Sequence, residues 1–256
     1  MTGNQLEIEF LGTGTSTGVP SIGCQCAVCL SEDPRDQRLR TSAIVRYGGK
    51  HILLDCGPDF RTQILRASDE RLDALLITHI HYDHVGGIDD LRAYCYEHHF
   101  PVFAHADVID DLRARLPYCF ADKPYPGAPL LDFMPVKEGE LFDFAGISIE
   151  PLPVMHHKLI LGYRIGPMAY ITDAKKVYPE VIERLKGIPL LVINALRYRP
   201  HNTHMSLNET LEVVREISPG RTYLIHMSDG IGLHAQTERQ LPADVHLAYD
   251  GLIVQI

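Results

Sequence analysis

Long apolar runs are missing from this sequence, and their absence limits where the protein can reside. No stretch approaches the roughly 20 consecutive apolar residues that a transmembrane helix requires. Residues 1–5 also lack a basic segment followed by an apolar one, which is the pattern of a secretory signal peptide. We therefore expect a protein that does not enter a membrane and that resides in the cytoplasm.

The sequence has no excess of positive charge either. Lys and Arg number 24 against 33 Asp and Glu, so the formal net charge is −9. Proteins that bind nucleic acid usually present a basic surface to the phosphates, so this balance argues against a large nucleic-acid substrate. Internal repeats, low-complexity tracts and long Pro/Gly-rich linkers are absent as well. We expect a single domain over residues 1–256.

Short apolar runs alternate with amphipathic segments along the chain. The runs that predict strands are 6–11, 42–47, 51–55, 72–78, 102–104, 147–154, 163–172, 190–194, 222–226 and 252–256. The segments that predict helices are 60–67, 108–116, 177–185 and 207–217, the last of which opens with a capping box of Ser206 and Glu209. Strands come first as a hairpin and later alternate with helices. This order predicts a layered α/β protein with sheets inside and helices outside.

Residues 79–84 carry the densest group of potential metal ligands in the chain. His79, His81, Asp83 and His84 directly follow the apolar run 72–78. Imidazole and carboxylate groups bind Zn, Mn or Fe, so we expect the first two to bind one metal ion and the last two to bind another. Glycines at 86 and 87 would let the backbone turn sharply beside this site. A histidine-rich surface loop is the alternative, and the density of ligands beside a buried strand argues against it.

The spacing H-x-H-x-D-H resembles the signature of the metallo-β-lactamase superfamily. The resemblance implies an αββα four-layer sandwich with two metal ions at one edge of its sheets. It also implies three later ligands, each at the end of an apolar run: His156, Asp173, which would bridge both metals, and His226. His157 competes with His156. The alternatives for Asp173 and His226 are a helix N-cap and a buried core histidine.

The N-terminal region narrows this resemblance to two branches of the superfamily. Residues 10–20 resemble the opening shared by the tRNA 3′-processing endonucleases (RNase Z) and the PhnP-type phosphoribosyl cyclic phosphodiesterases. Glycine-rich turns of this kind are common in other proteins, so the segment alone does not separate the two branches.

A cysteine cluster favours the PhnP-type branch. Cys24, Cys26 and Cys29 form a C-x-C-x-x-C pattern, and three thiolates so close together in a reduced protein favour zinc over a disulfide. The PhnP-type enzymes hold a structural zinc with three such thiolates and a later histidine. Asp229 occupies the position of that histidine here, and His234 is its rival as the fourth ligand.

The PhnP-type resemblance implies a metal-dependent phosphoric diester hydrolase. Two divalent ions, Mn or Zn, would be the active-site cofactors, and one Zn would be structural. His204, which precedes the helix predicted at 207–217, would protonate the leaving group, and His201 is its rival. Asp83 would take part in catalysis as a metal ligand.

The implied substrate is a small anionic phosphodiester, 5-phosphoribosyl 1,2-cyclic phosphate of phosphonate metabolism. Arg197, Arg199 and Lys158 are candidates for binding its remote phosphate because they lie close in sequence to His204 and His156. The resemblance also implies a homodimer. An RNase Z-like tRNA endonuclease is the main alternative, although no long Gly/Pro-rich insertion is present to grip tRNA. A non-catalytic, zinc-stabilised binding protein is the third possibility.

Overall fold

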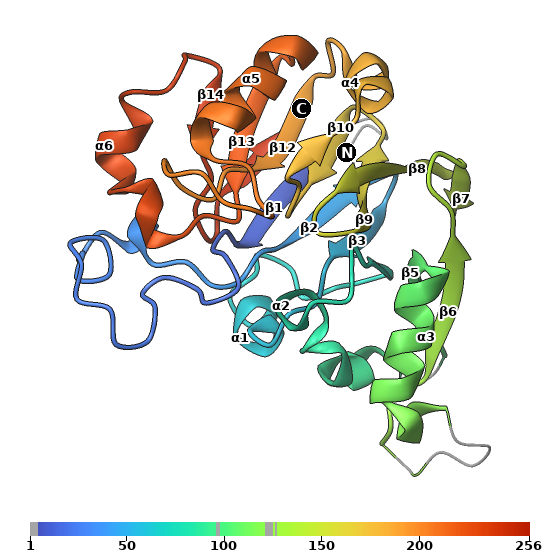
Figure 1. The fold of residues 1–256 in the computed structure, drawn as a ribbon. Coiled ribbons are helices and arrows are strands. Elements are labelled where there is room, and N and C mark those ends of the chain that lie inside the picture. The colour runs from blue at the N-terminus through green and yellow to red at the C-terminus, as the bar shows by residue number, and fades with distance from the viewer. Residues whose placement is uncertain (1–4, 96–97, 121–124, 126) are drawn as a thin grey trace.

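The chain folds into two stacked β-sheets with helices on their outer faces (Figure 1). This computed structural model describes residues 5–95, 98–120, 125 and 127–256. The first sheet has seven strands in the order β15-β1-β2-β3-β4-β5-β6, and the second runs β11-β8-β9-β10-β12-β13-β14 with β7 paired to β8. None of the helices in the described part of the chain is long and apolar enough to span a membrane.

The strands are short and mostly buried. Their bounds are β1 (Glu7–Gly12), β2 (Ser42–Tyr47), β3 (Lys50–Leu54), β4 (Ala74–Leu76), β5 (Phe100–His105), β6 (Leu131–Val136), β7 (Phe142–Phe144), β8 (Ile147–Met155), β9 (Leu159–Ile165), β10 (Met168–Ile171), β11 (Lys176–Val177), β12 (Leu190–Asn194), β13 (Arg221–Ile225), β14 (Val245–Leu247) and β15 (Ile253–Gln255).

The helices lie between these strands in the sequence. The α-helices are α1 (Phe60–Ile64), α2 (Tyr82–Val85), α3 (Ala106–Arg115), α4 (Pro179–Leu185), α5 (Leu207–Ile217) and α6 (His234–Glu238), and the 3₁₀ helices are Pro34–Asp36, Ile88–Tyr94, Pro117–Cys119 and Asp229–Ile231. The capping box predicted for α5 is confirmed, because Ser206 and Glu209 satisfy each other's backbone donors.

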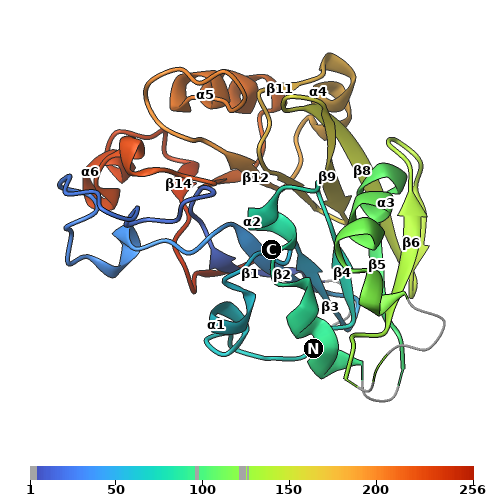
Figure 2. The same ribbon diagram turned by 60° about the horizontal axis from the view of Figure 1, so that its bottom comes forward.

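Three separate apolar clusters hold the layers together. In β2, Val45 packs into the cluster between the two sheets, whereas its neighbour Ile44 packs into the cluster beneath α1 and α3. In β12, Val192 likewise faces the other sheet and Leu191 faces α4 and α5. Both faces of these strands are therefore buried, which is why they read as continuous apolar runs. Figure 2 shows the resulting four layers, and the predicted αββα sandwich is confirmed.

Some sequence-based boundaries were wrong. The run 163–172 is not one strand, because a turn at Gly166, whose φ is 52°, separates the end of β9 from β10. The strand β6 was missed because it is short, contains Pro135 and lies at the edge of its sheet, where proline is tolerated. The helix predicted at 60–67 ends earlier, at Ile64.

The sheet topology brings distant residues to one edge. In the first sheet β3 and β4 are parallel, and in the second β10, β12 and β13 are parallel. Strand β8 runs in the direction of β10, because both are antiparallel to β9. Within each sheet the carboxyl ends of these strands therefore lie along one edge, and side chains that follow them in the two sheets come together there.

Candidate metal centre

The structure brings the first predicted set of metal ligands together. His79 and His81 follow β4, His156 follows β8 and Asp173 follows β10, and one potential ligand atom from each lies within 4.8 Å of the others. His79 Nε2 lies 3.0 Å from His81 Nδ1 and 3.8 Å from Asp173 Oδ2. Residues from both sheets thus surround one small volume.

A second group lies beside the first and shares one carboxylate with it. Asp83, His84, Asp173 and His226 also place their ligand atoms within 4.8 Å of one another. Asp173 Oδ1 is 3.2 Å from Nε2 of both His84 and His226, while its Oδ2 faces His79. The two oxygens of Asp173 therefore face different groups, which is the position of a bridging ligand.

Buried nitrogen atoms without partners show that these groups suit a cation. Nε2 of His84 and Nε2 of His226 are buried and accept or donate no hydrogen bond within the described residues. Leaving such atoms unpaired costs free energy. A divalent ion would satisfy both nitrogens and the carboxylates at once, and nitrogen with oxygen is a ligand set suited to Zn or Mn. The residues therefore fit a pair of divalent ions.

Hydrogen bonds behind the imidazoles fix which nitrogen faces the site. His156 Nδ1 donates to the carbonyl oxygen of Thr203 at 2.7 Å, which leaves the Nε2 lone pair free to bind a metal. His84 Nδ1 donates to Asp55 Oδ2 at 2.7 Å with the same effect. Partners of this kind set the tautomer and orientation of metal-binding histidines.

Asp55 was missed in the sequence analysis. It is fully buried, it follows β3, and its Oδ1 accepts the backbone N–H of Thr78 at 2.8 Å. A charged residue that ends the apolar run 51–55 is the signal that could have found it. Its role is to orient His84 from behind.

Three residues at this edge have a left-handed backbone. The φ angles of Asp55, Asp173 and His226 are 59°, 57° and 55°. Residues other than glycine adopt this conformation at a cost of about 1–3 kcal/mol each, and it is common at functional sites. In each case the chain leaves a strand and turns at once, which directs the side chain into the site.

Electrostatics favour a cation between the carboxylates. Burial opposes the ionisation of Asp173, yet His226 and His84 hold its pKa well below its usual range. Burial also opposes the ionisation of Asp83, whose pKa is held low by the nearby imidazoles of His84 and His226. Burial disfavours a charged His84, but Asp173, Asp55 and Asp83 raise its pKa well above normal. A divalent ion would replace that proton among the same carboxylates.

Close packing, and not a sharp turn, explains the two glycines after the motif. Gly86 and Gly87 have φ angles of −65° and −100°, which any residue adopts. A Cβ on Gly87 would lie 2.2 Å from the carbonyl oxygen of Gly57, and one on Gly57 would lie 2.1 Å from that of Asp83. The expectation that these glycines supply turning freedom was therefore wrong. They let the motif pack directly against the residues that follow β3.

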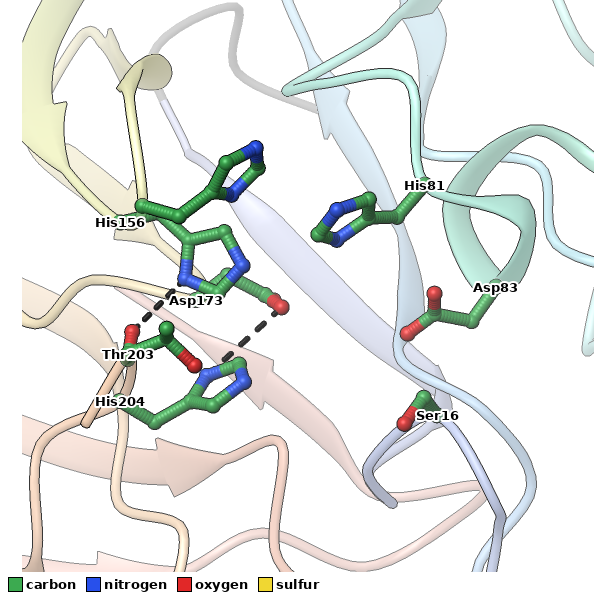
Figure 3. Close-up of a pocket in the computed structure, with 8 residues that line it drawn as sticks. Ser16, His81, Asp83, His156, Asp173, Thr203 and His204 are labelled. Atoms are coloured by element: carbon green, nitrogen blue, oxygen red, sulfur yellow. Dashed lines mark hydrogen bonds and ion pairs between the residues drawn. The ribbon is translucent and has the colours of Figure 1, made fainter. Parts of the chain in front are cut away.

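A pocket of about 310 Å³ opens over the shared carboxylate (Figure 3). It is lined by Ser16, His81, Asp83, His156, His157, Asp173, Thr203 and His204. Ser16 and Thr203 were not predicted; the polar turn that carries Ser16 was the available signal. His157, the rival of His156, is exposed at this pocket, where its ring stacks on that of His81 with 5.0 Å between centroids.

His204 projects into the pocket beside Asp173. Its Nδ1 lies 3.8 Å from Asp173 Oδ2, and its ring centroid is 4.9 Å from that of His226. Burial lowers the pKa of His204 to about 3. His201 lies behind it, with 5.1 Å between the ring centroids, and does not line the pocket. The geometry thus places His204, and not His201, against the candidate metal groups.

The cysteine cluster forms a third potential metal site. Cys24, Cys26 and Cys29 lie with Asp229 so that their ligand atoms are all within 4.8 Å of one another. The Asp229 Oδ2 atom is 3.6 Å from Cys24 Sγ and 3.4 Å from Cys26 Sγ. The backbone N–H of Cys29 lowers the pKa of Cys26, which favours the thiolate that zinc binds.

His234 lies away from the thiols. Its Nδ1 is 3.2 Å from a guanidinium nitrogen of Arg38, and its backbone N–H donates to Asp36. Burial and Arg38 lower its pKa to about 4. Asp229 is therefore the fourth residue at the cysteines.

The three side chains suggested to bind a remote phosphate, those of Lys158, Arg197 and Arg199, do not line the pocket. Lys158 Nζ pairs with Asp107 Oδ2 at 3.0 Å. Arg197 donates to the carbonyl oxygens of Arg199 and Pro200. Neither these residues nor any other Lys or Arg of the described chain lines the pocket.

Comparison with known proteins agrees with this geometry. A family model described as the beta-lactamase superfamily domain matches residues 50–227. The chain is 37% identical to a solved structure described as a new diphosphatase from the PhnP family, with a TM-score of 0.92, covering 98% of this chain and 97% of that one. These likenesses support a hydrolase.

Two curated relatives carry different names. An octanoyltransferase of Porphyromonas gingivalis is 49% identical over 246 residues, which is 95% of this chain and 50% of that protein. A ribonuclease Z of Bradyrhizobium diazoefficiens is 31% identical over 158 residues, which is 58% of this chain and 46% of that protein. The chain thus spans about half the length of these relatives. The fold, the ligand groups and the matches together show that the chain belongs to the metallo-β-lactamase superfamily and is PhnP-like within it.

Proposed function

We propose that this protein hydrolyses a small cyclic phosphodiester with the help of two divalent metal ions, Mn or Zn. The substrate that we propose is 5-phosphoribosyl 1,2-cyclic phosphate, which would place the protein in phosphonate metabolism. The observation that carries the proposal is the pocket over Asp173, with a volume of about 310 Å³. That volume is at the lower end of the range for small-molecule sites, which suits a compact phosphate ester.

The two ligand groups would divide the ions between them. His79, His81 and His156 would hold one, Asp83, His84 and His226 would hold the other, and Asp173 would contribute to both. Ions bound there polarise a phosphoryl oxygen and lower the pKa of water. The chain's own residues orient the ligands: Asp55 fixes His84, and the Thr203 carbonyl fixes His156.

His204 is the proposed proton donor to the departing ribose oxygen. Burial keeps the pKa of His204 at about 3 in the free pocket, so the imidazole is neutral at pH 7. An anionic phosphate bound next to it would favour the imidazolium and raise its pKa. The two ions would oppose a positive charge on His204, and the negative charge of the bound substrate would offset that effect and favour the protonated imidazole that acts as general acid.

A diphosphate is the second candidate substrate. The observation that favours it is the likeness to a PhnP-family protein described as a diphosphatase. Cleavage of a diphosphate also breaks a phosphorus–oxygen bond under the same electrostatic demands. A tRNA is the third candidate substrate, because the chain resembles a ribonuclease Z. The net charge of −9 and the small pocket argue against it.

The test is a substrate panel with metal-loaded protein. We expect hydrolysis of ribosyl cyclic phosphate and of bis(p-nitrophenyl) phosphate, with Asp173→Asn inactive and the exposed Asp110→Asn unaffected. Preferred hydrolysis of a nucleoside diphosphate would move the assignment to diphosphates. Trimming of precursor tRNA without sugar-phosphate turnover would move it to RNase Z. Absence of turnover with any metal would favour the third possibility, a non-catalytic, zinc-stabilised binding protein.

Three further expectations from the sequence stay predictions: a cytoplasmic location, a single domain and a homodimer.

A further inference from the structure

A tight turn at residues 15–18 borders the pocket, with Ser16 in the pocket lining. The N–H of Gly18 donates to the carbonyl oxygen of Thr15 at 2.8 Å and closes the turn. Ser16 and Thr17 are exposed at its tip, and Ser16 lines the pocket. Among the residues that the structure describes, the Ser16 hydroxyl and the N–H groups of Ser16 and Thr17 have no hydrogen-bond partner. Three donors are therefore unengaged in this turn, and Ser16 brings the turn to the edge of the cavity.

The turn is held in place from both sides. Thr15 N–H donates to the carbonyl oxygen of Met227 at 2.9 Å, in the segment that directly follows His226. The guanidinium Nε of Arg40 donates to the Ser16 carbonyl oxygen at 2.8 Å, and the same guanidinium pairs with Asp59 at 2.9 Å. These bonds fix the backbone while leaving the donors at the tip free. Donors that are already in position bind an anion without a cost of reorganisation.

The pocket would benefit from such donors because no Lys or Arg stands in its described lining to meet a phosphate. Its lining, within the described chain, contains neither Lys nor Arg, and Arg40 is engaged by Asp59 behind the turn. The candidate metal ions would occupy only the floor, around Asp173. An oxygen of the substrate that points away from the floor must find hydrogen-bond donors on the walls.

We infer that the Ser16 turn binds an anionic phosphate oxygen of the substrate and is a determinant of specificity; the inference rests on the proposed phosphodiesterase function. Figure 3 shows Ser16 next to Asp83 and across the pocket from His204. A phosphate held between these walls has its leaving group toward His204 and a free oxygen toward Ser16. The ligand class is a phosphate ester small enough to reach both walls at once. Backbone N–H groups in tight turns are known to form anion-binding concavities of this kind.

The experiment compares substitutions of Ser16 in the full-length, manganese-loaded protein. Ser16→Ala removes the hydroxyl, Ser16→Asn keeps a donor, and Ser16→Asp places a negative charge at the same position. Ser148→Ala is the matched control, because Ser148 is an exposed serine on β8 that does not line the pocket. The KM for bis(p-nitrophenyl) phosphate and the inhibition constant of inorganic phosphate are measured for each variant, and metal content is measured alongside.

A hydrogen bond to a charged group predicts an increase of about tenfold or more in both constants for Ser16→Ala. Ser16→Asp should raise them further than Ser16→Asn, while Ser148→Ala and all metal contents stay at wild-type values. Unchanged constants for Ser16→Ala and Ser16→Asp, in a protein that hydrolyses phosphodiesters, would overturn this inference and leave the proposed function intact.

Binding of phosphate separates the two proposals when turnover is missing. If the wild-type protein hydrolyses no phosphodiester, the proposed function is wrong. Calorimetric titration of the manganese-loaded protein with inorganic phosphate then tests the turn by itself. Weaker binding to Ser16→Asp than to wild type would support an anion site at Ser16, and equal binding would refute it.

Discussion

The replacement of Asp55 by asparagine tests how strongly the orientation of His84 affects metal binding. Asp55 itself would bind no metal ion, because its carboxylate is hydrogen-bonded to His84 and Thr78. Asp55 is fully buried, and its carboxylate accepts hydrogen bonds from three donors: the Nδ1–H of His84, the backbone N–H of Thr78 and the Thr78 hydroxyl. An asparagine has nearly the same shape but only one acceptor oxygen. Its amide nitrogen must therefore face either His84 Nδ1–H or the Thr78 N–H, and both are donors.

The size of the effect follows from the bond that is lost. A hydrogen bond to a charged group contributes about 1.5–3 kcal/mol, which corresponds to roughly 10–100-fold in a binding constant. Substitutions behind a metal ligand weaken metal binding by a similar factor of about 10–100. We therefore expect Asp55→Asn to bind Mn or Zn at the candidate centre about 10–100-fold more weakly than the wild-type protein does.

Competition with a fluorescent chelator measures this affinity directly. Asp110→Asn serves as the control, because Asp110 is exposed on α3 and its removal changes the formal charge by the same amount. Thermal unfolding in excess chelator shows whether the variant still folds. A folded Asp55→Asn protein with wild-type metal affinity would refute the claim that Asp55 sets the tautomer and orientation of His84.

Substitutions at four further residues test other parts of the structure. Asp173→Ala should weaken metal binding at both active-site groups by about 100-fold or more, measured by metal analysis after dialysis, since its two oxygens face different groups. His204→Ala should lower kcat by about 10²–10⁴-fold for a ribose leaving group, and far less for p-nitrophenolate, with metal content unchanged. Asp229→His should slow zinc release to a chromogenic chelator, because imidazole is the usual partner of three thiolates in structural zinc sites, and Asp229→Ala should speed it, because a methyl group binds no metal. The pKa of His234 is lowered to about 4 in the fold, so the unfolded chain binds more protons between pH 6.5 and 4. Its contribution to stability is thus complete above pH 6.5 and is lost as the pH falls, and urea unfolding of His234→Gln should show a shallower decline over that range.

The convergence of the candidate metal ligands could be predicted because these residues follow apolar strands. A buried strand reads as a continuous apolar run, and the fold places the carboxyl ends of several such strands at one edge. His156, Asp173 and His226 each stand directly after such a run, and the structure brings all three to the residues of the H-x-H-x-D-H motif. The same reasoning fails where a turn signal is overlooked, as at 163–172, where Gly166 and Pro167 separate β9 from β10.

The residues that the sequence did not reveal act through contacts with distant segments. Asp55 reads as the polar end of a hairpin strand, and only the packing of β3 beside β4 places it behind His84. The cations near His204 in sequence were natural candidates for binding a phosphate. Lys158 instead pairs with a carboxylate and Arg197 bonds to backbone carbonyl oxygens, and none of the three candidates lines the pocket.

Asp229 and Ser16 show the limit of spacing arguments. Asp229 stands only three residues after His226 on one short segment. The place that its spacing from His226 predicts is therefore the place where the structure has it, beside the three thiols. Ser16 reaches the pocket because Met227, in that same segment, receives the N–H of Thr15 and donates its own N–H to Thr13. One short segment therefore positions a histidine of the candidate metal centre, the carboxylate beside the three cysteines and the turn that carries Ser16. Local sequence fixes the first two of these, whereas the third depends on a pairing between the two ends of the chain that no local pattern encodes.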